Sequence, residues 1–349
     1  MQQLFPEGFV FTHALVGLSW ARVAQMDADL HDEALGHARA SLAAIRSDEG
    51  RRPFPSGQSP PGGAFHAGWS AYLAGQIVAA SRDTTEARAF EADCARLATA
   101  FEQTPFPMSY PGAAWPADAA VGVAALALHD RILAPRYGPT IQRWTSGVRA
   151  RLDPETGLVS HSADAATGAA RGGARGESLV LTLRFLADID PEFARQQYGR
   201  FRTRFVETRL GLPVVLAYPA GYRGAGDVDS GPIVWGVGLP ATVVGLGAAR
   251  AVGDAALAAP LDRELEALGL PLAWGAHRSY GFGALAVGEA FLVWARLTPA
   301  APDAGFAPVV RTAWRLPLAS LCILVAGLGV LLARRLLCPR SVSQPRTSS

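Results

Sequence analysis

An all-α fold, arranged as helical hairpins and followed by one separate apolar helix, is predicted for this chain of 349 residues. Two observations carry the prediction. Over about the first 300 residues, apolar side chains recur every three or four positions, which is the period of an amphipathic helix. Uncharged and mostly apolar residues then fill positions 316–333. The first observation predicts the main domain, and the second predicts a helix outside it.

The periodic stretches come in pairs with short connectors inside each pair. Long connectors rich in Gly, Pro and aromatic residues separate the pairs, at 46–63, 104–115, 152–175, 209–230 and 269–282. A unit that recurs every 50–60 residues, roughly, indicates a repeated supersecondary structure. The predicted helices cover residues 8–25 and 27–45, 64–81 and 85–103, 116–132 and 138–151, 176–188 and 191–208, 231–251 and 254–268, and 283–297.

Local sequence supports several of these boundaries. Asp190 precedes Pro191, so the aspartate is expected to cap a helix whose first residue is proline. Asp229 stands before Pro232 and is expected to cap the next inner helix in the same way. Five or six consecutive hairpins form either a closed (α/α)6 toroid or an open solenoid. Glycines in the expected helices permit close packing at some cost in helix propensity and favour the closed ring; they stand at 122, 236, 238, 245 and 247.

The domain layout follows from these patterns. We expect the toroid over residues 1–299, a linker over 300–315, a membrane-spanning helix over 316–335 and a polar tail over 336–349. About 18 apolar residues give roughly 27 Å of helix, close to the thickness of a bilayer core. The alternatives for this helix are a buried core helix and a partner-binding helix. The membrane-helix interpretation predicts a single-pass membrane protein with the lipid bilayer as partner.

The side of the membrane stays open at this stage. Arginines follow the apolar stretch in greater number than precede it, which places the tail in the cytoplasm under the positive-inside rule. The first 25 residues resemble an amphipathic helix and not a signal peptide, which keeps the domain in the cytoplasm instead.

Composition argues against several function classes. The formal net charge is +2 and no basic patch is interleaved with aromatics, so no nucleic-acid partner is expected. Cys94, Cys322 and Cys338 lack metal-ligand spacing. Asp227 and Asp229 resemble the start of a calcium loop, but the later ligands and the terminal glutamate are missing. Phosphate-loop, zinc-protease and nucleophile-elbow motifs are absent as well, so no metal or cofactor is expected.

The first candidate site lies in the Gly-rich segment Gly226–Pro232. Its glycines permit sharp turns and close approach of a ligand, and it carries Asp227 and Asp229 two positions apart. In extended backbone such neighbours point to opposite sides, so one of them is expected to face a site. Asp227 is the catalytic candidate, with Asp229 and the preceding Tyr222 as substrate-binding candidates.

Asp118 is the second catalytic candidate. It follows Tyr110 and Trp115, whose flat faces suit stacking on a sugar ring or on a hydrophobic ligand. A carboxylate in the first turn of a helix is also favoured by the helix dipole alone, so a capping role is an equal alternative. If the ring closes, Asp118 and Asp227 lie at the same rim. Two carboxylates there provide the general acid and base that glycosidic bond cleavage requires.

Weaker candidates stand at loop–helix junctions. Arg175 and Glu177 open an expected helix and are assigned to substrate binding, together with Tyr280 in the last long loop. His66 and His161 stand at similar junctions. Each of these residues also has an ordinary structural explanation as a solvated charge, a first-turn acid or a packed side chain.

With these motifs, residues 5–298 resemble the six-hairpin toroid proteins. That superfamily includes many glycosidases, polysaccharide lyases and sugar epimerases, and linalool dehydratase/isomerase shares the architecture. The resemblance rests on the strings Tyr110–Asp118, Ala174–Glu177 and Gly226–Pro232. It implies a carbohydrate-active enzyme, without naming a specific member. A glycan- or protein-binding toroid without catalysis, and an isomerase or dehydratase of a small hydrophobic alcohol, are the alternatives. The last is weakened because no cysteine falls in an inter-hairpin loop.

Overall fold

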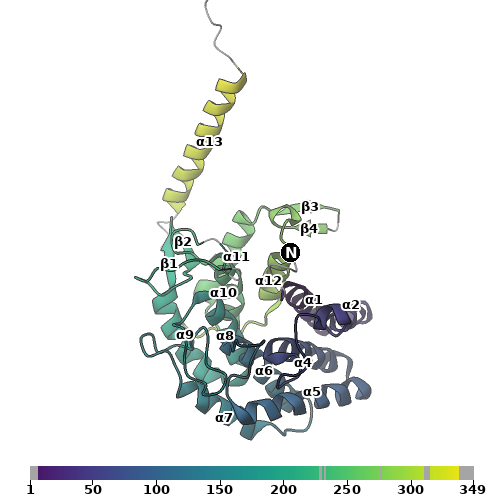
Figure 1. Ribbon diagram of the computed structural model, residues 1–349. Helices are drawn as coiled ribbons and strands as arrows, with labels where there is room; N and C mark the ends of the chain where they lie inside the picture. Colours follow the sequence, from purple (N-terminus) through teal and green to yellow (C-terminus); the bar gives the residue numbers. More distant parts are fainter. Residues whose placement is uncertain (1–6, 228–229, 232, 276, 310–314, 338–349) are drawn as a thin grey trace, which may run out of the picture.

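The computed structural model describes residues 7–227, 230–231, 233–275, 277–309 and 315–337. Its helices form a ring, and one further helix projects from it (Figure 1). Each helix of the inner wall contacts the next, and the last of them returns to contact the first. The ring is therefore closed and is not an open solenoid. The inner helices are α1 (Gly8–Met26), α4 (Gly63–Ser81), α6 (Pro116–Ile132), α8 (Gly176–Ile189), α10 (Leu239–Val252) and α12 (Ala286–Leu297).

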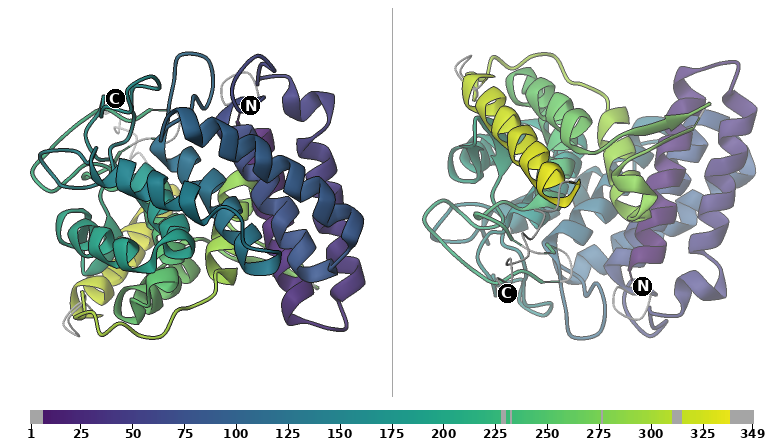
Figure 2. Two further views of the ribbon diagram at one scale, coloured as in Figure 1. Left: turned by 90° about the horizontal axis from the view of Figure 1, so that it is seen from below. Right: turned by 90° about the horizontal axis from the view of Figure 1, so that it is seen from above.

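Five outer helices surround this wall, and each packs against the inner helix that precedes it in the chain. Figure 2 shows the early helices of the ring, in purple, beside the light green α12, where the ring closes. A single-turn helix, α3 (Asp48–Arg51), lies in the loop after the first hairpin. The outer helices are α2 (His31–Ile45), α5 (Thr84–Gln103), α7 (Gly138–Arg149), α9 (Pro191–Phe205) and α11 (Ala255–Leu268).

Capping residues explain where several helices begin. The Asp190 side chain accepts a hydrogen bond from the Phe193 amide at 3.0 Å, directly before Pro191, as the sequence predicted. Helix α10 begins at Leu239, later than expected, because Trp235 and Gly236 form a tight turn at positive φ and Val237 bridges Leu216. A helix starting near Pro232 is therefore wrong, and the expected cap residue Asp229 lies outside the described residues.

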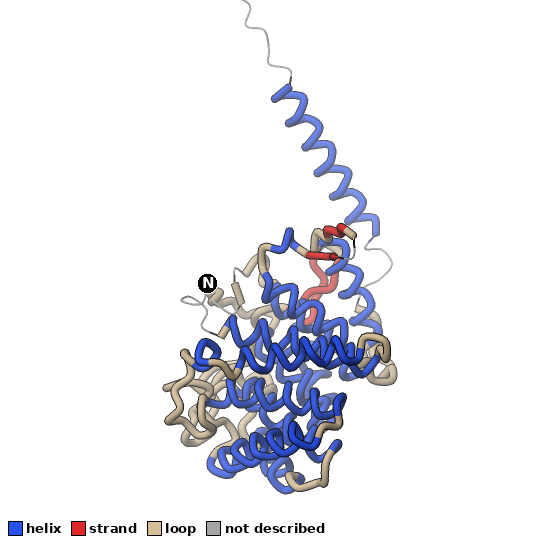
Figure 3. Tube along the Cα trace, turned by 90° about the vertical axis from the view of Figure 1, so that its right-hand side faces the viewer, coloured by secondary structure: helices blue, strands red, loops and turns tan. Residues whose placement is uncertain are grey.

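Short strands decorate the long loops, which the sequence did not predict. β1 (Val206–Arg209) pairs antiparallel with β2 (Leu212–Val215), and β3 (Leu272–Trp274) pairs antiparallel with β4 (His277–Ser279). A 3₁₀ turn, η1 (Gly281–Gly283), follows the second pair. Figure 3 shows how little of the molecule is strand, in red, beside the helices in blue. The fold is thus helical with two small β-hairpins.

Glycine permits the closest helix contacts in the wall. A Cβ atom on Gly68 of α4 would lie 3.0 Å from the backbone nitrogen of Gly122 in α6. The backbones of these two helices therefore approach each other where both side chains are missing. Gly245 and Gly247 make similarly tight contacts in α10, whereas Gly236 and Gly238 precede that helix. The expectation that glycines allow close packing applies to three of the five predicted positions.

The C-terminal apolar helix requires a correction. Helix α13 (Arg315–Leu337) forms over the expected stretch and projects away from the ring (Figure 1). Across the parts of the chain that the structure describes, no helix is long and apolar enough to cross a membrane. The predicted membrane-spanning helix at 316–335 and the membrane location deduced from it are therefore wrong, and the lipid partner has no support.

Residues 300–309, expected to be a linker, run back over the ring. The Ala301 amide donates to the Arg250 carbonyl at 2.8 Å, and the Ala304 amide donates to the Gly253 carbonyl at 2.9 Å. The Phe306 ring packs 5.3 Å from the Tyr198 ring of α9. The end of the toroid is thus fastened before α13 begins, and the domain limits proposed from the sequence stay a prediction.

Candidate active site

A cavity of about 110 Å³ opens at the end of the ring where the inner helices begin. Every inner helix contributes to its lining from its first two turns. Helix N-termini carry partial positive charge, which favours the carboxylates that line this end of the ring. The contributions are Phe11 from α1, Phe65 from α4, Asp118 from α6, Glu177 from α8, Pro240 and Val244 from α10, and Phe291 from α12.

Three loops meet over this cavity and are joined by backbone hydrogen bonds. The Ala163 amide donates to the Ala114 carbonyl at 3.0 Å, and the Gly176 amide donates to the Ala217 carbonyl at 2.9 Å. A Cβ atom on Gly176 would lie 2.1 Å from the Leu216 carbonyl oxygen. Only glycine fits at that position, between Arg175 and Glu177. The loops therefore hold the start of α8 in a fixed place.

Asp118 is positioned by the start of α6. Pro116 is the first residue of the helix and Trp115 is its N-cap, so Asp118 falls in the first turn. Its side chain is buried, with 5% exposed, yet it lines the cavity. The Trp115 amide donates to Ser109 Oγ at 3.3 Å, which anchors the turn before the helix.

Arg175 is the central cation of the site. Its Nη1 pairs with Asp227 Oδ2, and its Nε lies 4.0 Å from Glu177 Oε2. The guanidinium also lies 4.9 Å from the centre of the Tyr218 ring. Only 12% of the Arg175 side chain is exposed, and its Nη2 has no hydrogen-bond partner among the described residues. Its Nε likewise makes no hydrogen bond there, so two buried nitrogens of this arginine are unsatisfied.

Asp227 is held as a carboxylate. Burial alone would raise its pKa, but the Ser230 amide and the Arg175 guanidinium outweigh that effect and hold the pKa below its usual value. The Ser230 amide donates to Asp227 Oδ1 at 2.9 Å, and the Asp227 amide donates to Ser230 Oγ at the same distance. This reciprocal pair fixes the glycine-rich turn that carries the carboxylate.

His161 stands beside the aromatic wall of the site. Its ring centre lies 4.6 Å from that of Trp115, and its Nδ1 hydrogen-bonds to Ser178 Oγ. Burial, with the nearby charge of Arg175, lowers the pKa of His161 to about 4. The imidazole is therefore neutral at pH 7 and offers a ring nitrogen for a hydrogen bond with a hydroxyl group.

Six of the predicted site residues come together here. They come from three loops and two helices and line the same cavity: Tyr110, Trp115, Asp118, Arg175, Glu177 and Asp227. The placement brings the two catalytic candidates to one cavity, and their roles stay predictions. Asp229 lies outside the described residues.

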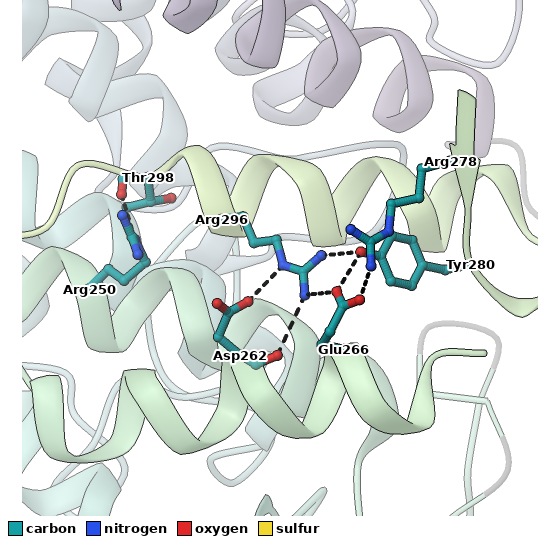
Figure 4. Close-up of polar contacts among 7 residues, drawn as sticks. All are labelled: Arg250, Asp262, Glu266, Arg278, Tyr280, Arg296 and Thr298. Atoms are coloured by element: carbon teal, nitrogen blue, oxygen red, sulfur yellow. Dashed lines mark hydrogen bonds and ion pairs between the residues drawn. The ribbon is translucent and has the colours of Figure 1, made fainter. Parts of the chain in front are cut away.

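Tyr222 and Tyr280 lie elsewhere. Tyr222 is 57% exposed and donates to Glu155 Oε2 at 3.0 Å. Tyr280 belongs to a polar network on α11 and α12 (Figure 4). Its hydroxyl donates to Glu266 Oε2 at 2.8 Å and accepts from Arg296 Nη1. Neither tyrosine lines the cavity, so their assignment to substrate binding has no support in the geometry.

Sequence reasoning missed the apolar wall of the cavity. Phe11 and Phe291 pack 5.4 Å apart where α12 closes against α1, and Phe65 lies 4.8 Å from Phe11. Ser178, the partner of His161, was missed as well. The sequence does place a large aromatic residue in the first two turns of each of these inner helices. That pattern predicts a shared wall only when the order of the helices around the ring is known.

The acidic groups of the site do not form a metal-binding cluster. Within the described ranges, no group of three or more His, Cys, Asp or Glu residues is placed to hold a metal ion. The donor set instead suits a ligand with hydroxyl groups, since it combines carboxylates, one arginine and a neutral imidazole.

Several solved structures that share this architecture are glycosidases. An unsaturated glucuronyl hydrolase specific for heparin superposes with a TM-score of 0.55 at 12% identity, covering 82% of this chain and 84% of that one. The GH76 alpha-mannanase of Bacteroides thetaiotaomicron gives 0.52 at 8% identity, with 83% and 85% covered. An inactive alpha-1,6-mannanase variant of Salegentibacter sp. HEL1_6 with two aspartates replaced, bound to alpha-1,6-mannotriose, gives 0.50 at 10%, with 83% and 89% covered.

Sequence comparison adds no closer relative. No protein-family model matches the chain, and no curated protein matches it. At these identities the structural likeness establishes the fold alone. The chain has the six-hairpin α/α-toroid fold that unsaturated glucuronyl hydrolases and GH76 mannanases share.

Proposed function

We propose that this protein is a carbohydrate-active enzyme that cleaves a glycosidic bond with the carboxylate pair Asp118 and Asp227. The observation that carries the proposal is their convergence: one comes from the start of α6, the other from the loop before α10, and both line the same cavity. Glycoside cleavage requires two carboxyl groups across the scissile bond, one to give a proton and one to act as base or nucleophile.

The surroundings of the two residues divide the roles. Asp227 is ionised because the Ser230 amide and Arg175 hold its pKa below the usual value, so it serves as the base or nucleophile and stabilises positive charge on the sugar ring. We assign the proton for the leaving oxygen to Asp118, which is buried at the start of α6 and lines the same cavity. Trp115 and Tyr110 supply flat faces for a sugar ring, and His161 a hydrogen bond to a hydroxyl.

Charge selects the class of sugar. Four carboxyl groups line the cavity, from Glu7, Asp118, Glu177 and Asp227, against one arginine. Even with the acid protonated, the site carries an excess of negative charge, which repels a uronic acid. Arg175 is already paired with Asp227 and does not reverse this balance. A neutral sugar is therefore the expected substrate at this cavity.

The test is release of reducing ends from a panel of neutral oligosaccharides, including alpha-1,6-mannotriose, beside uronate-terminated ones. We expect cleavage of a neutral substrate, and a drop in kcat of about 10²–10⁴-fold in Asp118→Asn and in Asp227→Asn. Asp29→Asn, at an exposed site far from the cavity, serves as the matched control and keeps full activity. No cleavage of any glycan, or full activity in Asp118→Asn, would refute the proposal.

A second candidate function has one observation in its favour. Phe11, Phe65 and Phe291, with Leu181 and Val244, make one wall of the cavity apolar. Such a wall suits an isomerase or dehydratase of a small hydrophobic alcohol. This second function predicts saturable binding of a terpenoid alcohol that no sugar displaces. The oligosaccharide panel then distinguishes it from a glycosidase, because no oligosaccharide would be cleaved.

A further inference from the structure

A second cavity, of about 240 Å³, lies at the opposite end of the ring. It is lined by the last turns of inner helices, whereas the candidate active site is lined by their first turns. Asp118 and Arg131 stand at the two ends of α6, 13 residues apart. At 1.5 Å per residue, they are separated by roughly 20 Å along the helix axis. The two cavities are therefore distinct.

This second cavity is cationic. Arg22 of α1, Arg131 of α6 and Arg184 of α8 line it, and Asp188 is the only acidic residue in its lining. The lining thus carries a formal charge of +2. Concentrating three arginines around one hollow costs repulsion unless negative charge offsets it.

Asp188 is already engaged and cannot neutralise all three. Its Oδ2 accepts hydrogen bonds from Arg184 Nη1 at 3.0 Å and from the Tyr72 hydroxyl at 2.8 Å. Its carbonyl oxygen accepts from Arg131 Nη1 at 2.9 Å. Arg22 has no carboxylate partner within the part of the chain that the structure describes.

Buried donors remain open on two of the arginines. Arg184 is deeply buried, with 7% of its side chain exposed, yet its Nε has no hydrogen-bond partner among the described residues, and the same holds for Arg22 Nε. Leaving a buried charged donor unsatisfied costs about 1–3 kcal/mol or more. An arginine near a helix C-terminus is favoured by the dipole, which explains Arg131 in the last turn of α6 but leaves the two open Nε atoms unexplained.

We propose that this cavity binds a small tetrahedral oxyanion, phosphate or sulfate, between Arg22 and Arg184, with Arg131 at the rim. Guanidinium groups donate two parallel hydrogen bonds to such oxyanions, and two negative charges match the formal charge of the lining. The anion would join the ends of α1, α6 and α8. Its expected effect is on the stability of the ring, without contact with the active-site cavity.

The test is thermal unfolding of the full chain with increasing inorganic phosphate or sulfate, at constant ionic strength set with sodium chloride. The melting temperature is expected to rise and saturate with either dianion, but not with chloride. Arg22→Gln is the test variant, because Arg184 also supports Asp188 in the core. Arg22→Gln should raise the dissociation constant of phosphate at least tenfold. Arg88→Gln, on the exposed face of α5, should leave that constant unchanged.

Two outcomes overturn the inference. One is a wild-type protein whose melting temperature does not respond to phosphate or sulfate. The other is an equal response in wild type and Arg22→Gln, which would place the anion elsewhere. The Asp118→Asn variant should keep the full phosphate response, so this result is independent of the proposed catalytic function.

Discussion

Asp227 and His161 are both kept unprotonated at neutral pH, although they carry different charges in that state. For the carboxylate, the Ser230 amide and the Arg175 cation overcome the effect of burial; for the imidazole, burial and the same cation act together. Arg175 therefore favours the unprotonated state of both groups, beside the larger effects of the Ser230 amide on Asp227 and of burial on His161. An ionised carboxylate beside a neutral hydrogen-bonding imidazole is an arrangement suited to a neutral, hydroxyl-rich ligand.

Replacing Arg175 should change the pH dependence of activity. In Arg175→Gln the carboxyl group of Asp227 loses its cation, so its pKa should rise. The acid limb of the kcat/KM profile should then move to higher pH than in wild type. An unchanged acid limb, with activity still measurable, would show that Asp227 is not the group that must be ionised.

His161 should make the protein less stable in mild acid. The unfolded imidazole binds a proton below pH 6.5, whereas the folded one stays neutral down to about pH 4. The stabilising contribution is therefore present above pH 6.5 and is lost as the pH falls towards 4. At pH 5 the loss is about 2 kcal/mol. The difference in free energy of unfolding between pH 7.5 and pH 5 should shrink by that amount in His161→Gln, measured by urea denaturation; an equal difference in both proteins would contradict it.

At the level of helices and strands, sequence signals worked where capping chemistry is local. The expected helix at 116–132 matches α6 (Pro116–Ile132), because proline at the first position and the apolar pattern both mark it. Helix α10 was expected eight residues too early, since a tight turn at Trp235 and Gly236 and the bridge between Leu216 and Val237 precede it. The strands of three or four residues are set by pairing across turns, which a periodicity of apolar residues does not reveal.

The polar network in Figure 4 fastens the second β-hairpin to α11 and α12. Arg296 is its hub, since Nε donates to Asp262 Oδ1 at 2.7 Å and Nη2 donates to Glu266 Oε2 at 2.9 Å. Removing the hub should destabilise the protein by about 1–3 kcal/mol, because several charged partners lose their donor at once. Replacing Arg278, whose side chain is 52% exposed, should lower the free energy of unfolding by less than about 1 kcal/mol.

Chemical denaturation of Arg296→Gln and Arg278→Gln compares the two positions directly. Neither should lower the proposed glycosidase activity by more than a small factor, because neither residue lines the candidate active-site cavity. Equal destabilisation by the two variants would mean that Arg296 is not the hub of the network.

For the whole molecule, closure of the ring creates the site. The motifs around Asp118, Arg175 and Asp227 were visible in the sequence because each combines glycine, aromatic and charged residues at a loop–helix junction. Phe11 and Phe291 were not, since nothing local indicates that α12 returns to α1. The apolar C-terminal stretch was misread for the opposite reason: local composition was the only guide, and the described helix does not meet the requirements of a membrane span.

Helix α13 should be dispensable for the ring. Its described apolar side chains, such as Ile323 and Leu324, are exposed, and the inner wall closes through α12 and α1 without it. A chain ending at residue 309 should therefore have a free energy of unfolding within about 1 kcal/mol of that of the full chain, and it should keep its activity. A large drop in melting temperature on truncation would show that α13 supports the toroid.

The central claim is that Asp118 and Asp227 act on one glycosidic bond in one cavity. A crystal structure of Asp118→Asn with a bound neutral oligosaccharide, alpha-1,6-mannotriose first, tests it most directly. We predict a glycosidic oxygen within about 3 Å of the side chain at position 118. The Asp227 carboxylate should lie roughly 5–10 Å from that side chain, across the same sugar. A sugar bound outside this cavity, or one that only one of the two side chains reaches, would contradict the account.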